Sequence, residues 1–531
     1  MRLVAAALLV VIGAVASAIQ VDLLRNETGG FWQSHFYAPS PPDANNCCKA
    51  NEEATCLDCA TEKKKKCVPE ANCLVIMKQI RCFCPFGTDG DGTKGCVPAR
   101  RGAMGGDPHY TTFDGTNYDY HGTCPYVYSK PRYLPQDTPY YYEVKAKNAE
   151  TPGNTATVES AEITMYGQKV FIDKDRKMFV NGERVYYPFY YPSIVQKWFT
   201  VENRQNTIFI RNRDFVEVQF KKTSLVVTLP DFPEYKGIHN VCGLNGNMNG
   251  LWQDDIISKD LLQYIYPSQT ITPSRLTNIE VAKFLDTWIT DDYPEESPDC
   301  STGVQMAGKF SNSCDQKTSK LQCQPIKDAI QGFGPFANCK ILGEKRLEDL
   351  YNGCAFDLCL NPASRCATFE SFVATCQSVT SNIDVPFWRG QTNCNIDCTA
   401  ISPFSSYSSC VQCQPTCDDP KQRSCSAQCY DGCQCDNGYL LDTSVNPPQC
   451  VVPEKCPCVD DDGQSHPDLT VWLNNGCTKS LACLDRKIMS LPKQCPENST
   501  CGLEDGEKAC VCKQGFAWND ARTACIVDVE V

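Results

Sequence analysis

Five oxygen-bearing side chains have the types and spacing of a calcium site. Asn247, Asn249, Asp254 and Asp255 lie along one glycine-containing turn, and Asp114 comes from a distant strand end. Calcium takes about six to eight oxygen ligands at loose geometry, which a turn and a cross-chain carboxylate can supply. An alternative is an Asn/Gly turn whose side chains hydrogen-bond the local backbone. The spacing alone favours this second interpretation.

The peptide bond between Asp107 and Pro108 has the composition for self-cleavage. The carboxyl group of Asp107 can attack its own carbonyl carbon to form an anhydride, and proximity favours such an intramolecular attack. His109 could give a proton to the departing proline nitrogen. The alternative, an ordinary turn at the start of a strand, is favoured.

Signatures of an enzyme that acts on a separate substrate are absent from the sequence. It contains no HExxH, GxSxG or phosphate-loop motif, and none of its five histidines forms a metal-ligand pair. The pairs Cys56/Cys59 and Cys410/Cys413 resemble zinc knuckles or redox pairs but lack histidines at ligand spacing. We therefore predict no catalytic residues and no zinc. The 531 residues carry a net charge of −13, which argues against a nucleic-acid partner.

The N-terminus has the pattern of a secretory signal peptide over residues 1–18. Arg2 precedes an apolar run over residues 3–15, and Ala16-Ser17-Ala18 is a cleavage site with small residues. No later segment approaches the roughly 20 apolar residues of a membrane span. We expect a soluble, secreted chain, and the sequons at Asn26 and Asn498 are then glycosylation sites.

The uneven distribution of the 38 cysteines divides the chain into the domains that must position these candidate site residues. An oxidising route makes disulfides the default, and the even count would let every bridge close within one chain. After a linker over residues 19–46, residues 47–96 form a cysteine-rich module similar to epidermal growth factor modules. Residues 103–290 are poor in cysteine and alternate in polarity at 207–211, 215–220 and 225–229, which predicts strands. Asn181-Gly182 predicts a hairpin turn, and a β-sandwich is the economical interpretation.

The rest of the chain is predicted to consist of stapled modules. Residues 366–376 place apolar residues at three-to-four-residue steps, which predicts a helix in a small domain over residues 300–394. Ten cysteines follow at 398–456, and a last module covers 458–525. The predicted fold class is multidomain and mainly β: a sandwich, a disulfide-rich helical domain, and disulfide-rich modules of little secondary structure.

Several motifs, in order, resemble the extracellular D assembly of von Willebrand factor and the mucins. GDPHYTTFDG at 106–115 and GTCPY at 122–126 are similar to the opening of a type D domain, and CGLNGNMNG at 242–250 and FLDTW at 284–288 to its end. The cysteines at 339–394 resemble the eight-cysteine domain that follows, and those at 398–456 a trypsin-inhibitor-like domain. The likeness covers residues 103 to about 525.

The resemblance implies structural calcium at the five positions, with the carbonyls of Met248 or Leu251 completing the shell. Some relatives cleave themselves at the Asp-Pro bond. Many assembling relatives have a cysteine where this chain has Asn245, so a covalent multimer is doubtful. The cysteines expected in disulfides are Cys124, Cys242, Cys339, Cys354, Cys359, Cys366, Cys376, Cys394, Cys398, Cys410, Cys413, Cys417, Cys425, Cys429, Cys433, Cys435, Cys450 and Cys456.

The expected function is that of a calcium-stabilised structural or adhesive glycoprotein of a matrix, mucus or cell-surface coat, with extracellular proteins or glycans as partners. One alternative is a serine protease inhibitor acting through the trypsin-inhibitor-like domain. Its segment Cys425-Ser-Ala-Gln-Cys429 has no basic anchor, so the target would be elastase-like, and a spacer role is favoured. A second alternative is a self-cleaving protein of the mucus type.

Overall fold

The computed structural model describes residues 66–76, 79–83, 88–89, 93, 95–106, 109–151, 155–204, 207–221, 223–237, 240–260, 264–265, 279–309, 316–379, 385–411, 414–422 and 430–528. The chain divides into a unit of residues 1–58 and a unit of residues 59–531, and all of the described residues lie in the second unit.

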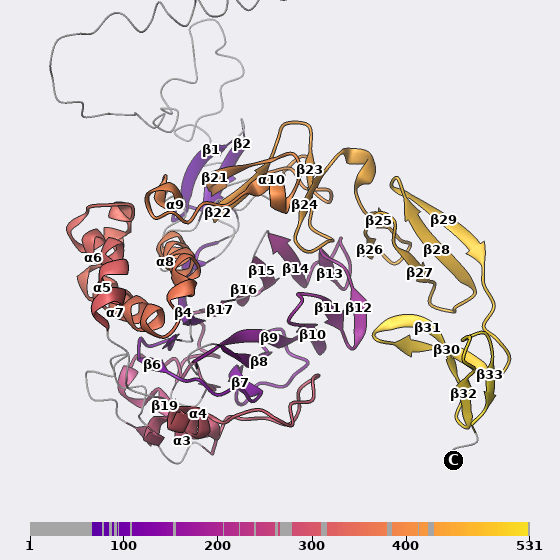
Figure 1. Cartoon of the computed structure of the whole chain (residues 1–531), viewed down its shortest axis with the longest axis horizontal. Coiled ribbons are helices and arrows are strands. Elements are labelled where there is room, and N and C mark those ends of the chain that lie inside the picture. The colour runs from indigo at the N-terminus through magenta and orange to yellow at the C-terminus, as the bar shows by residue number, and fades with distance from the viewer. Residues whose placement is uncertain are drawn as a thin grey trace, which may run out of the picture. The chain divides into compact units, whose positions relative to one another are not determined.

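Two antiparallel sheets, one of seven strands and one of nine, form the predicted β-sandwich (Figure 1). The seven-stranded sheet has the order β12 (Glu183–Val185), β11 (Met178–Val180), β10 (Gln168–Ile172), β9 (Thr155–Met165), β8 (Tyr142–Thr151), β7 (Tyr126–Pro131), β18 (Val241–Cys242). The nine-stranded sheet has the order β13 (Phe189–Tyr191), β14 (Phe199–Arg204), β15 (Thr207–Asn212), β16 (Glu217–Lys221), β17 (Ser224–Pro230), β4 (Val97–Gly105), β5 (His109–Thr111), β6 (Asn117–Asp119), and β3 (Thr88–Asp89) pairs with β4.

Apolar and polar residues alternate along these strands, as expected for sheets with one buried face. In β15, Ile208 and Ile210 are fully buried while their neighbours are half-buried, because successive side chains of a strand point to opposite faces. The buried faces of both sheets form one core. Asn181 and Gly182 have φ angles of 51° and 85°, which confirms the predicted turn between β11 and β12.

Buried tyrosines fill the part of the core beneath the candidate site. Tyr110 and Tyr118 stack with ring centroids 4.9 Å apart. The hydroxyl groups of Tyr110 and Tyr126 are hydrogen-bonded at 2.9 Å, and Tyr126 donates to Asn148 at 2.9 Å. A buried hydroxyl without a partner would be costly, so this network fixes β5 and β6 against β7.

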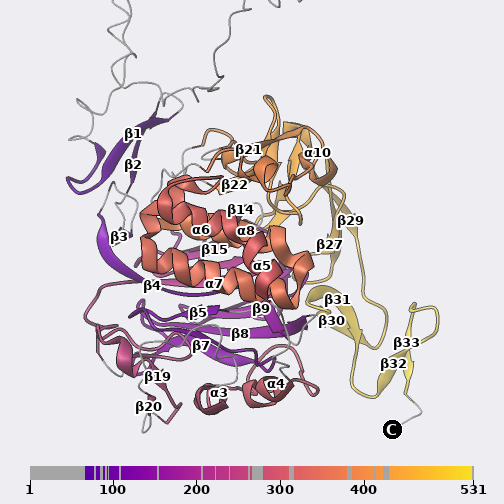
Figure 2. The same cartoon turned by 60° about the vertical axis from the view of Figure 1, so that its left-hand side comes forward.

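Helices cover one face of the nine-stranded sheet, as Figure 2 shows. The predicted helix at 366–376 is confirmed as part of α8 (Arg365–Val379). Around a core that includes Phe336, Phe372 and Trp388, three disulfides join the helices. The elements of this part are α5 (Gln316–Gln322), α6 (Gln324–Gln331), η4 (Ala337–Leu342), α7 (Glu344–Leu360), η5 (Pro362–Ser364), α8 and α9 (Trp388–Gln391). Two further helices, α3 (Ile279–Asp286) and α4 (Gly303–Lys309), precede them.

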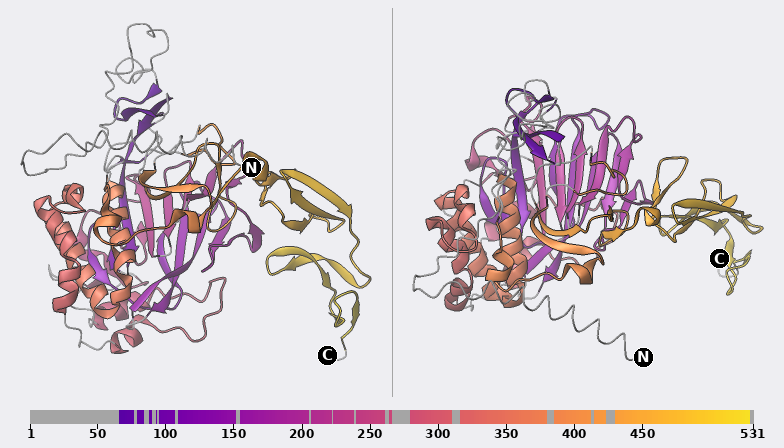
Figure 3. Two further views of the ribbon diagram at one scale, coloured as in Figure 1. Left: turned by 45° about the horizontal axis from the view of Figure 1, so that its top comes forward. Right: turned by 90° about the horizontal axis from the view of Figure 1, so that it is seen from above.

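The modules beyond residue 398 consist of α10 (Cys398–Ile401), η6 (Pro453–Lys455) and short strands closed by disulfides (Figure 3). They hold more strand than the cysteine spacing indicates. Their hairpins are β21 (Ser405–Val411) with β22 (Tyr430–Cys435), β23 (Leu440–Asp442) with β24 (Gln449–Val451), β25 (Cys458–Val459) with β26 (Ser465–His466), β30 (Ser499–Glu504) with β31 (Glu507–Cys512), and β32 (Phe516–Trp518) with β33 (Cys525–Val527). A three-stranded sheet combines β27 (Val471–Leu473), β28 (Lys479–Leu484) and β29 (Lys487–Pro492). In the described part of the N-terminal module, β1 (Asn72–Ile76) pairs with β2 (Gln79–Phe83) beside the Cys67–Cys82 disulfide.

Candidate calcium site and the adjoining domain interface

The first loop of the candidate site joins β5 to β6. The amide of Thr112 donates to the carbonyl of Thr116 at 2.9 Å, and its hydroxyl accepts from the amide of Thr116 at 2.8 Å. Gly115 has a φ of 99°, a backbone conformation that glycine adopts without strain. These contacts hold the carboxylate of Asp114 at the tip of the loop.

The second loop follows β18. The amide of Asn245 donates to the carbonyl of Tyr128 at 3.0 Å, which ties the loop to β7. Gly246 has a φ of 72°, and a Cβ atom there would lie 2.8 Å from Oδ1 of Asp255. Only glycine fits this position, so the loop can close directly over the carboxylate.

The five predicted oxygen ligands meet where the two loops join. Oδ2 of Asp114 accepts from the amides of Asn249 and Gly250 at 2.9 and 2.8 Å. Asp254 accepts from the side-chain amide of Asn247 at 3.2 Å and from that of Asn249 at 2.8 Å. The oxygens of Asn247 and Asn249 accept from amides two residues further on, at 3.1 and 2.7 Å, so the loop is also a series of Asx turns.

Asp255 is the most deeply placed carboxylate of the site. It is 2% exposed, the hydroxyl of Thr112 donates to its Oδ2, and its buried Oδ1 has no hydrogen-bond partner. The pKa of Asp255 is raised to about 7, because burial and the charge of Asp114 outweigh the opposing hydrogen bond from Thr112. A buried oxygen without a partner is unfavourable, and a cation would relieve that cost.

Three carboxylates and two amide oxygens are hard donors, and such a set fits calcium. Among the described residues no group of three or more His, Cys, Asp and Glu side chains could hold a metal, so a cation here would also need asparagine and backbone oxygens. The guanidinium of Arg100 on β4 pairs with Oδ1 of Asp114, and a cation would share that carboxylate with it.

A second group of charged residues, which the sequence did not reveal, lies beside the first loop. Nδ1 of His109 is 2.6 Å from Oδ1 of Asp119, and its Nε2 is 2.8 Å from Oδ1 of Asp357 on α7. Burial would lower the pKa of His109, but the charges of Asp357 and Asp119 outweigh it and raise the pKa well above 6.5. The imidazolium therefore joins the sandwich to the helical domain. Because 248 residues separate His109 from Asp357, no spacing rule could have paired them.

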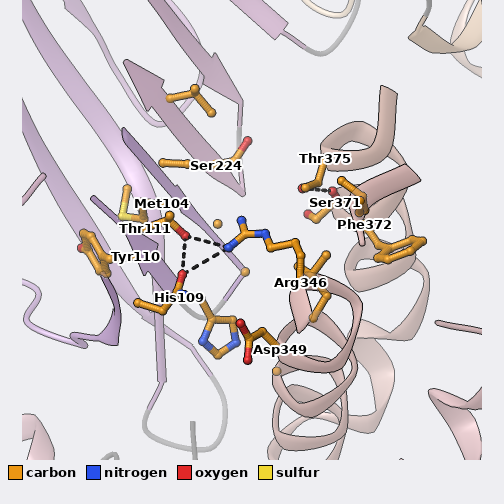
Figure 4. Close-up of a pocket in the computed structure, with 18 of the residues that line it drawn as sticks. Met104, His109, Tyr110, Thr111, Ser224, Arg346, Asp349, Ser371, Phe372 and Thr375 are labelled. Atoms are coloured by element: carbon orange, nitrogen blue, oxygen red, sulfur yellow. Dashed lines mark hydrogen bonds between the residues drawn. The ribbon is translucent and has the colours of Figure 1, made fainter. Parts of the chain in front are cut away.

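The interface around this imidazolium encloses a cavity of about 1360 Å³ (Figure 4). Strands β5, β6, β16 and β17 line one side and helices α7 and α8 the other. Arg346 reaches across it and donates to Thr111 and Asn117, both at 3.2 Å. Thr223 and Ser371 form a further hydrogen bond of 3.3 Å between the two parts.

A chain of ion pairs runs from the sandwich to the first stapled module. Lys221 on β16 pairs with Glu370 on α8 at 2.9 Å, and Glu370 lies 3.4 Å from Arg389 on α9. Arg389 donates to Oδ2 of Asp431 at 2.8 Å, and the indole of Trp388 donates to Oδ1 of Asp431 at 3.0 Å. This series of ion pairs therefore couples three domains.

Other predicted site residues fall partly outside the described residues. Asp107 and Pro108 lie outside them, as do Asn26 and residues 425–429 of the inhibitor-like segment. Asn498 is half-buried, with a φ of 62°, immediately before β30. Both ring nitrogens of His109 already face carboxylates, so this side chain is held as a bridge between domains.

Apart from Cys242, the cysteines whose side chains are described form disulfides. Cys359 is disulfide-bonded, and the side chains of Cys410, Cys413, Cys425 and Cys429 lie outside the described residues. The bridges that contain predicted cysteines are Cys124–Cys300, Cys323–Cys354, Cys339–Cys376, Cys366–Cys394, Cys398–Cys433, Cys417–Cys456 and Cys435–Cys450. Among the described residues the bridges of the last module are Cys458–Cys483, Cys477–Cys501, Cys495–Cys510 and Cys512–Cys525.

Cys242 corrects one prediction: it is a buried free cysteine and not part of a disulfide. It lies in β18, paired with β7, and its thiol contacts the carbonyl of Lys130 at 3.6 Å. Three residues further on lies Asn245, whose side chain packs against Gly102 of β4.

Family comparisons divide the chain into four domains. The von Willebrand factor type D domain matches residues 102–262, and the C8 domain matches residues 322–395. The trypsin inhibitor like cysteine rich (TIL) domain matches residues 398–456, and the TILa domain matches residues 457–511. The residues of the candidate calcium site all fall in the first domain, and His109 and Asp357 lie in the first and second domains.

Similar proteins share much of this chain. Human alpha-tectorin is 27% identical over 77% of the chain, rabbit (Oryctolagus cuniculus) zonadhesin 26% over 87%, and human IgGFc-binding protein 24% over 80%. The chain spans only 18%, 19% and 7% of the lengths of these relatives. In the described part of the chain no helix is long and apolar enough to span a membrane.

Proposed function

We propose that this protein is a secreted structural or adhesive glycoprotein of a matrix, mucus or cell-surface coat. The chain carries a type D domain followed by C8, TIL and TILa domains, and this domain series supports the proposal. The observation that carries the proposal is the coupling of these domains by buried contacts, such as the pair of Arg389 and Asp431. A coupled series of domains presents a fixed surface to partners and needs no catalytic group. One relative is named for binding the Fc part of IgG, and we infer by analogy that extracellular proteins or glycans are the partners.

Calcium would act structurally in this proposal. Asp114, Asn247, Asn249, Asp254 and Asp255 would hold it between the two loops, and the partnerless oxygen of Asp255 supports this assignment. The bound cation would supply positive charge to a cluster of carboxylates. It would thereby pin the loop after β18 to the loop between β5 and β6.

Localisation tests the main proposal. Immunolocalisation of the endogenous protein, combined with crosslinking, should place it outside cells next to insoluble coat material, and enzymatic deglycosylation should reduce its mass through Asn26 or Asn498. The protein should co-fractionate with that material. A protein that stays inside cells and carries no glycan would contradict the proposal.

The TIL match supports protease inhibition as a second candidate. The full chain would then inhibit an elastase-like protease at nanomolar concentration, through the segment Cys425–Cys429. An absence of inhibition by the full chain leaves the spacer role for this domain.

Self-cleavage at Asp107–Pro108 is a third candidate, and we expect the chain to stay intact at neutral pH. His109 is engaged by Asp119 and Asp357 on both ring nitrogens, so its proton is not readily given to a leaving group. N-terminal sequencing of the reduced protein after incubation at neutral and acidic pH tests this expectation. A fragment that begins at Pro108 would show that the bond breaks.

A further inference from the structure

The three-stranded sheet of the TILa domain exposes an apolar face. Directly paired residues of antiparallel strands point to the same face, so Val471, Ala482 and Met489 lie side by side, and so do Leu473, Ser480 and Leu491. Val471 is 66% exposed, Met489 56% and Leu491 70%. An exposed apolar face of this kind marks an interaction site.

The opposite face of the same sheet is occupied. The indole of Trp472 stacks on His466 with ring centroids 3.6 Å apart, and Cys483 is joined to Cys458. The sheet is thus anchored on one side, while its other side carries apolar residues that no other part of the described chain covers.

Strand β29 forms the edge of this sheet, and in the described chain it pairs only with β28. All six of its residues are exposed. The turn residues Asp485 and Arg486 have φ angles of 47° and 61°, as in a two-residue type I′ hairpin. In such a hairpin the residues hydrogen-bonded to β28 alternate with residues whose amides point outward, here Ile488 and Ser490. These amides can bind an added strand.

The surroundings of this edge are cationic, although the chain carries a net charge of −13. Lys479, Arg486, Lys487 and Lys493 flank the edge, and within the described chain none of them forms an ion pair with a carboxylate. The neighbouring Asp485 pairs with Lys455 at 2.6 Å. A partner strand should therefore combine apolar side chains with acidic ones.

One segment of this chain has that composition. Residues 526–531 read Ile-Val-Asp-Val-Glu-Val, with apolar and acidic residues in alternation. Ile526 and Val527, the first two of them, end β33 and are 53% and 65% exposed, and within the described chain β33 pairs only with β32, so its other edge is open to a second strand. We propose that the edge strand β29 of one molecule binds residues 526–531 of a second copy as an added strand. The contact joins two different surfaces, so it can propagate from copy to copy without closing. This self-association goes beyond the proposed function and does not depend on calcium.

A labelled peptide of residues 526–531 tests the contact with the full chain. Fluorescence anisotropy should show saturable binding that weakens as salt is raised. The double variant Lys487→Glu/Lys493→Glu should bind about tenfold more weakly or worse. The matched control Lys320→Glu/Lys340→Glu makes the same charge change on exposed lysines of α5 and η4 and should bind like the wild type. A peptide with lysine in place of Asp528 and Glu530 should reverse the preference between the wild type and the β29 variant.

Sedimentation of the full chain tests whether the partner is a second copy. The average mass should rise with protein concentration, and the free peptide should suppress that rise. Equal peptide affinity for the β29 variant and the control, or no saturable binding, would overturn the assignment of the site. A chain that binds the peptide yet stays monomeric at all concentrations would overturn the second copy as the occupant.

Discussion

At the scale of single residues, Asp254 is the carboxylate that both asparagines of the candidate calcium loop contact. We expect Asp254→Asn to lose most of the stabilisation by calcium, because the variant removes one anionic ligand. A ligand at about 100 times its Kd stabilises the native state by about 2.7 kcal/mol, so the Tm of the wild type should rise with calcium. Thermal unfolding with calcium and with a chelator measures this effect. The exposed residue Asp137 supplies the control Asp137→Asn, which should keep the full rise; equal behaviour of the two variants would argue against the site.

The thiol of Cys242 gives a second prediction at this scale. It is 4% exposed, and burial raises its pKa to about 11 against the opposing charges of Lys130 and Arg132. Because the thiolate is the reactive form, we expect iodoacetamide to modify Cys242 only after unfolding. Peptide mass mapping after labelling without reductant would show this difference. Rapid labelling of the native chain would mean that β18 opens readily.

The proximity of the five candidate oxygen ligands was predictable because their motifs are local, and the loops do bring these residues together. Their partners were not predictable in the same way. Arg100 reaches Asp114 from β4, Thr112 reaches Asp255 from the loop after β5, and nothing in the spacing of the carboxylates identifies such partners. The same reason explains the error over Cys242, because the count of cysteines contains no information about which sulfur lies beside which.

At the scale of elements, His109 joins β5 to α7, and its stabilising effect should depend on pH. The groups that face it are Asp119 on β6 and Asp357 on α7, while burial lowers the pKa of nearby His121 to about 4, so that ring is neutral. The pKa of His109 is raised in the folded chain, so its contribution is complete below the unfolded value of about 6.5 and is lost as the pH rises through the folded value.

We therefore expect His109→Gln to lower the free energy of unfolding most at mildly acidic pH and progressively less at alkaline pH. Urea unfolding at a series of pH values measures this difference. Lys345→Gln removes an exposed charge from the first turn of α7 and should show no such trend. A difference that grows with pH would contradict the assignment of an imidazolium.

The elements themselves were largely predictable. Alternation of polarity identified β15, β16 and β17, and three-to-four-residue steps identified α8, because each pattern repeats within a few residues. How the helices lie on the nine-stranded sheet was not predictable. That arrangement depends on contacts such as those of His109 and Arg346, which join residues more than two hundred positions apart.

At the scale of the whole molecule, the pair of Arg389 and Asp431 links the C8 and TIL domains. Their side chains are 7% and 4% exposed. Removing one partner of such a buried pair costs about 3–5 kcal/mol, so Arg389→Met should lower the Tm and make the TIL domain more sensitive to proteases. The exposed pair of Arg522 and Glu504 provides a control, Arg522→Met, with an expected cost of about 0–1 kcal/mol. Similar losses in both variants would show that the pair of Arg389 and Asp431 does not couple the domains.

The domain order was predictable because motifs and cysteine blocks occur one after another along the chain. The docking of the domains was not. Tyr190 in the type D domain meets Asp418 in the TIL domain at 3.0 Å, and the amide of Arg184 donates to Gly506 in the TILa domain at 2.7 Å. Neither contact involves a recognisable motif.

Because the buried thiol of Cys242 is free, the number of cysteines left to form disulfides matters. Each disulfide uses two sulfurs, and the chain has 38 cysteines, so with Cys242 unpaired an odd number remains. At least one further cysteine therefore cannot find a partner within these 531 residues. That sulfur is a thiol, a mixed disulfide with a small thiol, or a bridge to another chain. Alkylation of the unfolded, unreduced 531-residue chain should accordingly give a monomer with an even number of labels, a monomer with a thiol adduct, or a covalent dimer, but never a monomer with a single label and no adduct.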